Sequence, residues 1–435
     1  MYKMSKFTFK TTDNYGNLLL YNTYIGKYSF CKICDKTAIN SIVKNELSGL
    51  SENSLKRLAD KGIVVEANED ENKKMFSQFL DIVSPRKLNL IINPTEHCNF
   101  RCKYCYETFK NGEMSKQTQE ELISFVRDNI HKYSGLNVSW FGGEPLLAKN
   151  VIEDLSDNFM RICQFNKRTY RATMTTNGYL LDIDTFRKML DSQINLFQIT
   201  IDGIQSIHDS QRVTVSGTGT YKKIFDNLLE IKNSKIRNFN IVLRTNFTQE
   251  IFDHFDEYLN SISVLCENDP RFSIACYKVG KWGDFLPNEL LSKLVSDASE
   301  GMRQIYTRIL ACEKRISVRT DYLNPGMGLC YGGKKNSFVI SSAGSIHKCT
   351  INFEEPGSII GSFSGNKIQY NSKYYRYIAN PSRCKSYYDC FFAPVCTGDP
   401  CPLKSDKDRK CSFVKDNLDL VLKISDRYEP FDIIA

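Results

Sequence analysis

The sequence predicts an α/β protein whose centre is a partial (β/α)6 parallel barrel, flanked by a small N-terminal α+β domain and a C-terminal Cys-rich domain. Three observations lead to this prediction. Residues 86–280 alternate six apolar, strand-like runs with helix-like stretches, which is typical of parallel strands joined by helical crossovers. The residues before 86 carry a hairpin pattern followed by short helices, and seven cysteines follow residue 326.

The length and these patterns divide the chain into four predicted parts. They are residues 1–85, the barrel at 86–285, a helical bridge at 286–325 and the Cys-rich domain at 326–435. A chain of 435 residues is too long for one small domain. Its hydrophobic share of 41% and charged share of 25% are ordinary for a globular protein.

The composition excludes several classes of function. The chain has no run of about 18 apolar residues and no apolar stretch behind its first residues, so we expect neither a membrane span nor a secretory signal, and a cytoplasmic location. The net charge of +8 is spread along the chain, which favours neither nucleic acid nor a membrane surface as partner. Sixteen cysteines in a cytoplasmic chain indicate metal chemistry rather than disulfides.

The first 85 residues show the pattern of a small α+β domain. Residues 7–11 alternate like a strand, residues 14–17 (Asn-Tyr-Gly-Asn) are a turn signal, and residues 18–22 return as a second strand. The remaining predicted elements here are helices at 37–44, 51–61 and 72–82 and a strand at 63–65.

The barrel elements follow in alternation. The predicted strands are residues 88–93, 138–141, 171–176, 196–201, 240–244 and 271–277. The predicted helices between them are residues 117–132, 151–166, 182–190, 221–233 and 252–265. In parallel barrels the chemistry lies at the carboxyl ends of the strands, so the residues that follow each strand are the candidate site.

A short loop after the first strand carries Cys98, Cys102 and Cys105 in a C-x3-C-x2-C spacing. Three thiolates on one loop hold three corners of a cubane iron–sulfur cluster and leave the fourth iron without a protein ligand. Tyr104 lies where its ring would stack on a purine. The alternative is a structural zinc site, but zinc usually takes four ligands from paired C-x2-C knuckles, and no fourth ligand is near in the sequence.

This spacing, with the aromatic Tyr104 directly before the third cysteine, resembles the signature of the radical S-adenosylmethionine (radical SAM) enzymes. Residues 142–145 (Gly-Gly-Glu-Pro) match the GGEP motif that the family carries after its second strand. Residues 198–203 (Gln-Ile-Thr-Ile-Asp-Gly), followed by His208 and Arg212, are also similar to the family pattern.

The resemblance implies a catalytic [4Fe–4S] cluster on Cys98, Cys102 and Cys105. Its open iron would chelate the amino and carboxylate groups of SAM, and one electron would cleave SAM to a 5′-deoxyadenosyl radical. Because Gly142 and Gly143 lack side chains, backbone groups there could bond the amino group of SAM.

Further SAM contacts are predicted at the ends of later strands. Glu144 would complement the charge of the SAM ammonium, and Asn177 follows the third strand. Alternate positions on a strand share a face, and on the fourth strand these positions are Gln198, Thr200 and Asp202. Two of these side chains would bond ribose hydroxyls or the carboxylate of SAM. Arg212, on the loop that follows, would pair with the SAM carboxylate, or else form a surface salt bridge.

The C-terminal cysteines resemble the ligands of the SPASM domain, which holds two auxiliary [4Fe–4S] clusters in this family. They are Cys330, Cys349, Cys384, Cys390, Cys396, Cys401 and Cys411. The first part of the family pattern, C-x9–15-G-x4-C, fits Cys330, Gly344 and Cys349. The later group departs from the pattern, with five residues between Cys384 and Cys390 where the family has two.

The resemblance implies a four-ligand set of Cys384, Cys390, Cys396 and Cys411 for one auxiliary cluster. The other cluster would use Cys330, Cys349 and Cys401, which leaves an open iron or a place for Cys312. We favour the open iron, because it could bind a substrate thiolate. Three [4Fe–4S] clusters and SAM are thus the expected cofactors, and two Cys-rich zinc sites are the alternative for this domain. Cys163, Cys266 and Cys276 are expected in the core.

The N-terminal pattern resembles the winged-helix leader-recognition element of peptide-modifying enzymes, with a generic cap on the barrel as the alternative. Together the resemblances imply a thioether-forming (ranthipeptide- or sactipeptide-type) maturase of a ribosomally synthesised precursor peptide. A flavodoxin- or ferredoxin-type protein would donate electrons. The enzyme alternatives are a carbon–carbon crosslinking maturase and an anaerobic sulfatase-maturing, formylglycine-forming enzyme. The non-enzyme alternative is an iron–sulfur electron carrier.

Overall fold

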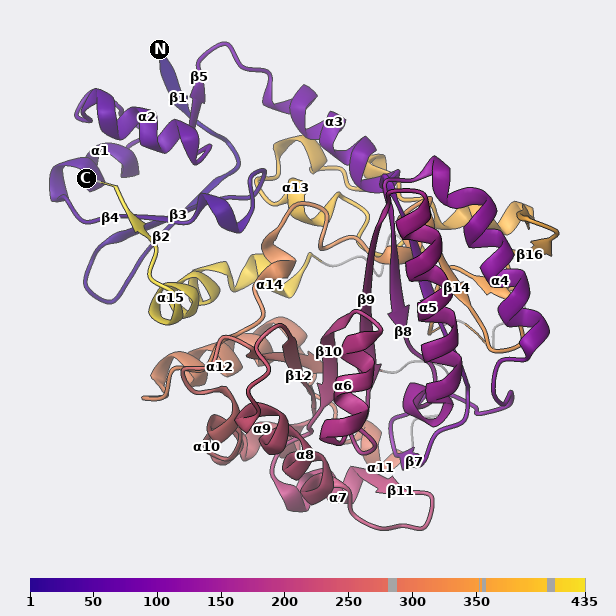
Figure 1. Cartoon of the computed structure of the whole chain (residues 1–435). Coiled ribbons are helices and arrows are strands. Elements are labelled where there is room, and N and C mark those ends of the chain that lie inside the picture. The colour runs from indigo at the N-terminus through magenta and orange to yellow at the C-terminus, as the bar shows by residue number, and fades with distance from the viewer. Residues whose placement is uncertain (281–287, 352, 354–356, 405–410, 435) are drawn as a thin grey trace. The chain divides into compact units, whose positions relative to one another are not determined.

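The computed structural model of the chain describes residues 1–280, 288–351, 353, 357–404 and 411–434. The chain forms two compact units, each built from separate segments (Figure 1). The N-terminal unit is Met1–Ser84, Met302–Lys334 and Ile378–Ala435, and the barrel unit is Pro85–Gly301 and Lys335–Tyr377. The four-part domain division stays a prediction, and the start of its bridge at residues 286–287 lies outside the described residues.

The barrel unit contains the six parallel strands that the sequence predicts. They are β6 (Lys87–Ile92), β8 (Gly135–Trp140), β9 (Thr169–Thr176), β10 (Ile194–Thr200), β12 (Asn240–Phe247) and β13 (Phe272–Lys278). Each pairs in parallel with the next one in the chain. The predicted partial (β/α)6 barrel is confirmed.

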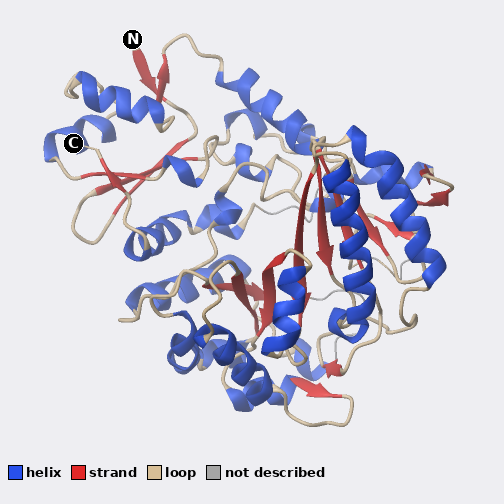
Figure 2. Ribbon diagram, viewed as in Figure 1, coloured by secondary structure: helices blue, strands red, loops and turns tan. Residues whose placement is uncertain are grey.

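Helices join these strands, as Figure 2 shows in blue between the red strands. They are α4 (Lys116–Asn129), α5 (Lys149–Phe165), α6 (Ile183–Asp191), α7 (Gln205–Gln211), α8 (Tyr221–Asn233), α9 (Gln249–Asp253) and α10 (Phe255–Cys266), with 3-10 turns η2 (Ile130–Lys132) and η3 (Pro145–Ala148). Capping residues begin them: the side chain of Ser115 accepts from Thr118 N, and that of Asp182 accepts from Thr185 N. One face of α5 buries Val151, Leu155 and Phe159 at helical spacing, so this face packs inward.

The barrel sheet continues beyond β6 with strands that the sequence analysis did not identify. β14 (Ser337–Ile340) pairs in parallel with β6. β15 (Ile346–His347), β16 (Gly361–Ser364) and β17 (Lys367–Tyr370) extend the sheet antiparallel, and η6 (Ser372–Tyr377) follows. These strands have two to four residues, too few for a two-residue alternation to be recognised in the sequence.

Three local expectations differ from the structure. β12 continues to Phe247, so Arg244 does not end its strand. The helical bridge predicted at 286–325 is not one continuous helix, because its residues form two separate helices, α11 (Asn288–Leu291) and α12 (Ala298–Ala311). His208 and Arg212 do not lie on a loop: His208 is in α7 and Arg212 begins β11 (Arg212–Thr214).

The N-terminal unit contains the predicted hairpin, formed by β2 (Thr8–Thr12) and β3 (Leu18–Asn22). β4 (Cys31–Ile33) and β18 (Asp432–Ile433) complete a sheet of order β18-β4-β3-β2. A second small sheet pairs β1 (Tyr2–Met4) with β5 (Val64–Glu66). The helices are α1 (Lys36–Val43), α2 (Glu52–Asp60), α3 (Glu71–Val83), α13 (Ala393–Cys396), α14 (Phe413–Asp416) and α15 (Leu418–Tyr428), with 3-10 turns η1 (Lys27–Ser29), η4 (Asp321–Leu323), η5 (Tyr331–Gly333), η7 (Pro381–Arg383) and η8 (Tyr387–Asp389).

Among the residues described, no helix combines the length and the apolar character that crossing a membrane requires. Cys163, Cys266 and Cys276 are buried, which confirms that they are core cysteines. Cys31 is buried in β4, whereas Cys34 is exposed.

Candidate active site

The cysteine loop leaves the end of β6 and is held in place by a two-stranded ribbon. Within this loop, β7 (Phe100–Cys102) pairs antiparallel with β11, so that Cys102 lies opposite Arg212. The amide of Phe100 lies 3.4 Å from the sulfur of Cys98 and donates to it, and the amide of Cys105 donates to the carbonyl of Cys102 over 3.1 Å. The three predicted ligands therefore sit on one ordered turn beside the segment that follows β10.

The three thiols share one partly buried site. Burial raises the pKa of Cys98 to about 12, with further increases from Glu144, Cys102 and Cys105. Burial also raises the pKa of Cys105 to about 12, and Cys102 contributes to that shift. Bound iron would reverse these shifts, because cationic metal stabilises thiolates.

The described residues contain no group of three His, Cys, Asp or Glu side chains at the spacing of a single-ion site. The fit to a [4Fe–4S] cluster therefore rests on the three converging soft donors, which are the ligands that such clusters take.

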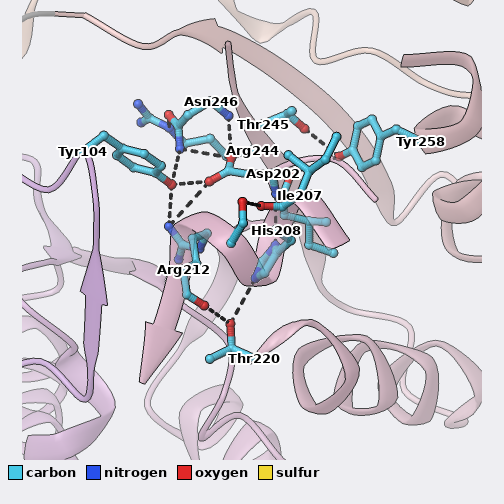
Figure 3. A network of polar contacts seen from close by, with 12 residues as sticks. Tyr104, Asp202, Ile207, His208, Arg212, Thr220, Arg244, Thr245, Asn246 and Tyr258 are labelled. Carbon is cyan, nitrogen blue, oxygen red and sulfur yellow. Dashed lines mark hydrogen bonds and ion pairs between the residues drawn. The ribbon is translucent and has the colours of Figure 1, made fainter. Parts of the chain in front are cut away.

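A buried polar network fixes Tyr104 (Figure 3). Its hydroxyl donates a short hydrogen bond to Oδ2 of Asp202 and accepts one of 2.6 Å from Nη1 of Arg212. The same guanidinium nitrogen lies 3.8 Å from Oδ2 of Asp202. Asp202 is fully buried and Arg212 is 6% exposed, so each charge is balanced chiefly by the other.

The pKa values in this network follow from burial and from the paired charges. Burial raises the pKa of Asp202, although Arg212 and the Tyr104 hydroxyl oppose the increase. Burial by itself would lower the pKa of Arg212, but Cys102, Tyr104 and Asp202 raise it overall, so Arg212 stays a cation. Burial raises the pKa of Tyr104 well above its ordinary value, so its hydroxyl keeps its proton.

Arg212 is suited to hold an anionic ligand group. Its Nε is buried and has no hydrogen-bond partner among the described residues. Its guanidinium lies 5.7 Å from the ring centre of Phe100, the first residue of β7. A guanidinium N–H without an acceptor binds a carboxylate well. The unpartnered Nε of Arg212 therefore fits the predicted pairing of this residue with the SAM carboxylate.

His208 positions Arg212 through Thr220. Nδ1 of His208 accepts from the amide of Asp202 over 3.2 Å, and Nε2 donates to Oγ1 of Thr220 over 3.1 Å. The Thr220 hydroxyl then donates to the carbonyl of Arg212 over 2.7 Å. Burial, together with the charge of Arg212, lowers the pKa of His208 well below its ordinary value, so the ring is neutral and has the tautomer that these bonds need.

The GGEP segment ties the end of β8 to the cysteine loop and to β9. A side chain at Gly142 would meet the carbonyl of Thr95, and one at Gly143 would meet the carbonyls of Glu96 and His97. Both glycines thus allow close approach to the backbone that leads to the cysteines.

Glu144 has three protein partners in this structure. It is fully buried, and Oε1 accepts from Leu146 N over 3.0 Å and from Thr176 Oγ1 over 2.7 Å. Oε2 accepts from Asn177 N over 2.7 Å. Burial raises its pKa, and these three hydrogen bonds oppose the increase. The SAM contact predicted for Glu144 stays a prediction, and its observed bonds join β8 to β9.

The remaining predicted contacts surround the same strand ends. The side-chain amide of Asn177 donates to Oδ1 of Asn99, in the cysteine loop, over 2.8 Å. Gln198 is half-buried and Thr200 is buried, both on β10 just before Asp202. The structure therefore brings all the predicted SAM-contact positions to one end of the sheet.

Sequence reasoning missed Asn246 and Asn93. The amide of Asn246 donates to Oδ1 of Asp202 over 2.7 Å, and its side chain reaches the Tyr104 hydroxyl at 3.3 Å. Asn93, just after β6, has a buried side-chain oxygen with no partner among the described residues. Both are polar residues at the carboxyl end of a predicted apolar strand, which is the signal that would have identified them.

Four of the C-terminal cysteines converge within the N-terminal unit. Burial raises the pKa of Cys396 to about 11, and Cys390, Cys384 and Cys411 raise it further. Lys415 lies 3.9 Å from the Cys411 sulfur. These four are the set that the sequence resemblance implies for one auxiliary cluster.

The other predicted auxiliary ligands lie in both units. The amide of Cys330 donates to the carbonyl of Pro400 over 2.9 Å, next to Cys401, so these two ligands are near each other in the N-terminal unit. Cys349 belongs to the barrel unit. Cys312 follows α12 in the N-terminal unit.

The chain is similar to several known proteins. Residues 92–260 match the family model of the Radical SAM superfamily. The chain is 23% identical over 351 residues to the serine-type anaerobic sulfatase-maturating enzyme of Bacteroides thetaiotaomicron, an alignment covering 70% of this chain and 80% of that protein. It is 25% identical over 142 residues to the Fe-coproporphyrin III synthase of Methanosarcina barkeri, covering 33% of this chain and 34% of that protein.

The fold is similar to that of solved structures as well. The structure of native anSMEcpe with bound AdoMet and Cp18Cys peptide aligns with a TM-score of 0.55 and 17% identity, covering 78% of this chain and 96% of that one. Residues 92–260 therefore match a radical SAM domain, as the cysteine loop and the GGEP segment predict, and the solved structure has a similar fold.

Proposed function

We propose that this radical SAM chain is a peptide maturase, which joins a cysteine sulfur to a carbon of an acceptor residue in a ribosomally synthesised precursor peptide. The observation that carries the proposal is that one chain contains two separate sets of clustered cysteines. One is the loop of Cys98, Cys102 and Cys105 at the end of the barrel sheet, and the other is the convergent C-terminal group around Cys396.

The first set suits hydrogen-atom abstraction. A [4Fe–4S] cluster with SAM, when bound and reduced, supplies a carbon radical that abstracts a hydrogen atom from substrate. Arg212 would hold the SAM carboxylate through its unpartnered Nε, and Asn93 Oδ1 is an acceptor suited to the SAM ammonium. Tyr104, fixed by Asp202 and Arg212, would place its ring against the adenine.

The second set suits electron transfer and thiolate binding. Cys384, Cys390, Cys396 and Cys411 would fill all four ligand positions of one auxiliary cluster. The family resemblance assigns Cys330, Cys349 and Cys401 to a second auxiliary cluster, with one iron left for a substrate thiolate. An auxiliary iron that is open to a substrate thiolate favours a thioether over a carbon–carbon product, because the sulfur would be held for bond formation.

The proposed reaction replaces one C–H and one S–H bond with one C–S bond, so the peptide loses two hydrogens. One leaves as a hydrogen atom on 5′-deoxyadenosine. The other leaves as a proton from the thiol together with one electron, which passes through the auxiliary clusters to an external acceptor. The proposed partners are the precursor peptide with its leader, bound by the first 85 residues, and a flavodoxin- or ferredoxin-type electron donor.

Sulfatase maturation is the second candidate, because the match to the serine-type anaerobic sulfatase-maturating enzyme covers 70% of this chain. A carbon–carbon crosslinking maturase would use the same barrel site. An electron carrier would not need the unpartnered Arg212 donor beside the cysteine loop.

Anaerobic co-expression with candidate precursor peptides tests these functions. The intact mass of the peptide is measured with and without thiol alkylation, and SAM cleavage is followed in parallel. Loss of two hydrogens per site and of one alkylatable thiol supports the thioether, whereas loss of two hydrogens with all thiols retained supports a carbon–carbon crosslink. Conversion of a sulfatase-derived peptide to formylglycine supports sulfatase maturation. Absence of SAM cleavage by the reconstituted protein contradicts all three.

A further inference from the structure

The edge of the N-terminal sheet at β4 is occupied by a strand from the far end of the chain. In the order β18-β4-β3-β2, β18 pairs in parallel with β4, with Asp432 opposite Cys31 and Ile433 opposite Lys32. The amide of Ile434 donates to the carbonyl of Lys32 over 2.9 Å. All of these residues belong to the same unit, so the pairing is internal to it.

Two buried side chains, Phe431 and Ile434, anchor this strand. Ile434 is 1% exposed and belongs to a core cluster with residues from the sheet and from α1 and α2, among them Ile33, Ile42 and Leu58. The neighbouring Ile433 is 58% exposed. Phe431 is 6% exposed, and its ring stacks on that of Phe30 with 4.5 Å between the ring centres, so the segment is anchored by one aromatic and one aliphatic side chain.

Two cations of the N-terminal sequence hold the polar groups of the same strand. Lys61 forms an ion pair of 2.5 Å with the Asp432 carboxylate. The Arg57 guanidinium donates to the carbonyl of Ile433 over 2.8 Å. The site at β4 is therefore built for an extended segment with an acid and, two residues further on, a large aliphatic side chain.

The contact that holds β18 is small. The strand has two residues, and both are exposed. A sheet edge binds through its backbone, so any extended peptide with matching side chains competes for it. Two buried anchors, one ion pair and a two-residue backbone pairing hold the segment, and a competing hexapeptide with the same side chains supplies all of these contacts.

We propose that the β4 edge is a peptide-binding site and that β18 is its internal occupant. The precursor peptide would bind there by displacing β18, through a segment with Asp or Glu at the position of Asp432 and Ile, Leu or Val at the position of Ile434. This inference rests on the proposed peptide-modifying function and adds to it the recognised sequence pattern. β18 then acts as a competitor that keeps the edge covered until a matching peptide arrives.

The test uses a fluorescein-labelled peptide with the sequence of residues 429–434, Glu-Pro-Phe-Asp-Ile-Ile, added to the full chain. Its affinity is measured by fluorescence anisotropy for the wild type, Ile434→Asp and Ile433→Asp. Ile434→Asp places a charge in the buried anchor position and frees the edge, whereas Ile433→Asp makes the same change at an exposed position. We expect at least about tenfold tighter binding to Ile434→Asp than to the other two proteins.

A charge reversal checks the register. Adding Lys61→Glu to Ile434→Asp should remove most of the gain in affinity for the labelled peptide. A labelled peptide with Lys in place of its Asp should bind this double variant with the affinity restored. Equal binding to all three proteins, or indifference to Lys61, would overturn the proposal.

A measurement on the wild type covers the case in which Ile434→Asp does not fold. Excess unlabelled hexapeptide should raise deuterium uptake at residues 429–434, and unchanged uptake would also overturn the proposal. None of these measurements needs SAM or clusters. A protein that modifies a precursor without using this edge contradicts only this inference, and one that binds the probe but never cleaves SAM contradicts only the proposed function.

Discussion

The hydroxyl of Tyr104 and the carboxylate of Asp202 share a buried hydrogen bond although 98 residues separate them in the sequence. Tyr104 stands between two predicted cluster ligands, and Asp202 follows β10. The bond therefore joins the cysteine loop to the strand end where SAM is expected, and Arg212 bonds to both sides of it.

Tyr104→Phe should keep the fold and weaken the site. Asp202 and Arg212 would lose the hydroxyl that lies between them, and hydrogen bonds to charged groups contribute about 2 kcal/mol. We expect roughly tenfold weaker SAM binding by the reconstituted protein, measured by equilibrium dialysis, and a changed electron paramagnetic resonance spectrum of the SAM-bound cluster. Tyr15→Phe, at a position 91% exposed, is the matched control. Unchanged SAM affinity and spectrum would show that the bond does not position the loop.

Glu144→Gln should destabilise the barrel unit. The carboxylate accepts from Leu146 N, Thr176 Oγ1 and Asn177 N, and an amide would turn its NH2 group toward at least one of these donors. A buried mismatch of this kind costs about 2–3 kcal/mol. Chemical denaturation measures the loss, and Glu120→Gln on the exposed face of α4 is the control. Equal stability of the two variants would mean that Glu144 does not hold β8 to β9.

Cys390→Ser combined with Cys396→Ser should remove one auxiliary cluster. Cys396 lies among Cys384, Cys390 and Cys411, so the double variant leaves two ligands for a cluster to which the resemblance assigns four. We expect the reconstituted variant to hold about four fewer iron atoms per chain than the wild type. Cys163→Ser, in the core, should leave the iron content unchanged.

Cys312→Ala should leave the iron–sulfur content of the reconstituted chain unchanged. Cys312 follows α12, and the proposed function leaves one auxiliary iron open rather than bound by this residue. Iron and sulfide analysis and Mössbauer spectroscopy of the reconstituted variant should match the wild type. Loss of one cluster would make Cys312 its fourth ligand and remove the open iron from the proposal.

Stability should fall between about pH 6.5 and pH 4 because of His347. Burial lowers the pKa of His347 to about 4, whereas an unfolded histidine titrates near 6.5. As the pH falls, the unfolded state binds the proton first, so the stabilisation by the neutral ring is complete above about pH 6.5 and is lost on the way down to about pH 4. The free energy of unfolding should drop by up to about 3 kcal/mol over this window.

His347→Gln is the control for the pH dependence, since glutamine keeps hydrogen-bonding groups for Ser345 and Ser358 but does not titrate. The variant should lose the contribution of His347 to the decrease. A decrease of at least similar size should remain, because burial lowers the pKa of His208 well below its ordinary value as well. An identical pH profile for the variant would exclude His347 as the cause.

The sequence by itself determined the parallel barrel and the chemistry of its cysteine loop. Apolar runs and helical spacing are local, so six strands and the helices between them were readable without contacts. The candidate cluster ligands could be recognised for the same reason, because Cys98, Cys102 and Cys105 lie within eight residues.

The tertiary structure alone decided which distant residues meet. The bonds from Tyr104 to Asp202 and Arg212, and from Glu144 to Thr176 and Asn177, join separate strand ends. The pairing of β14 with β6 and of β18 with β4 joins segments hundreds of residues apart. Such pairings depend on packing and on the burial of polar groups that must find partners, and neither leaves a periodic signal in the chain.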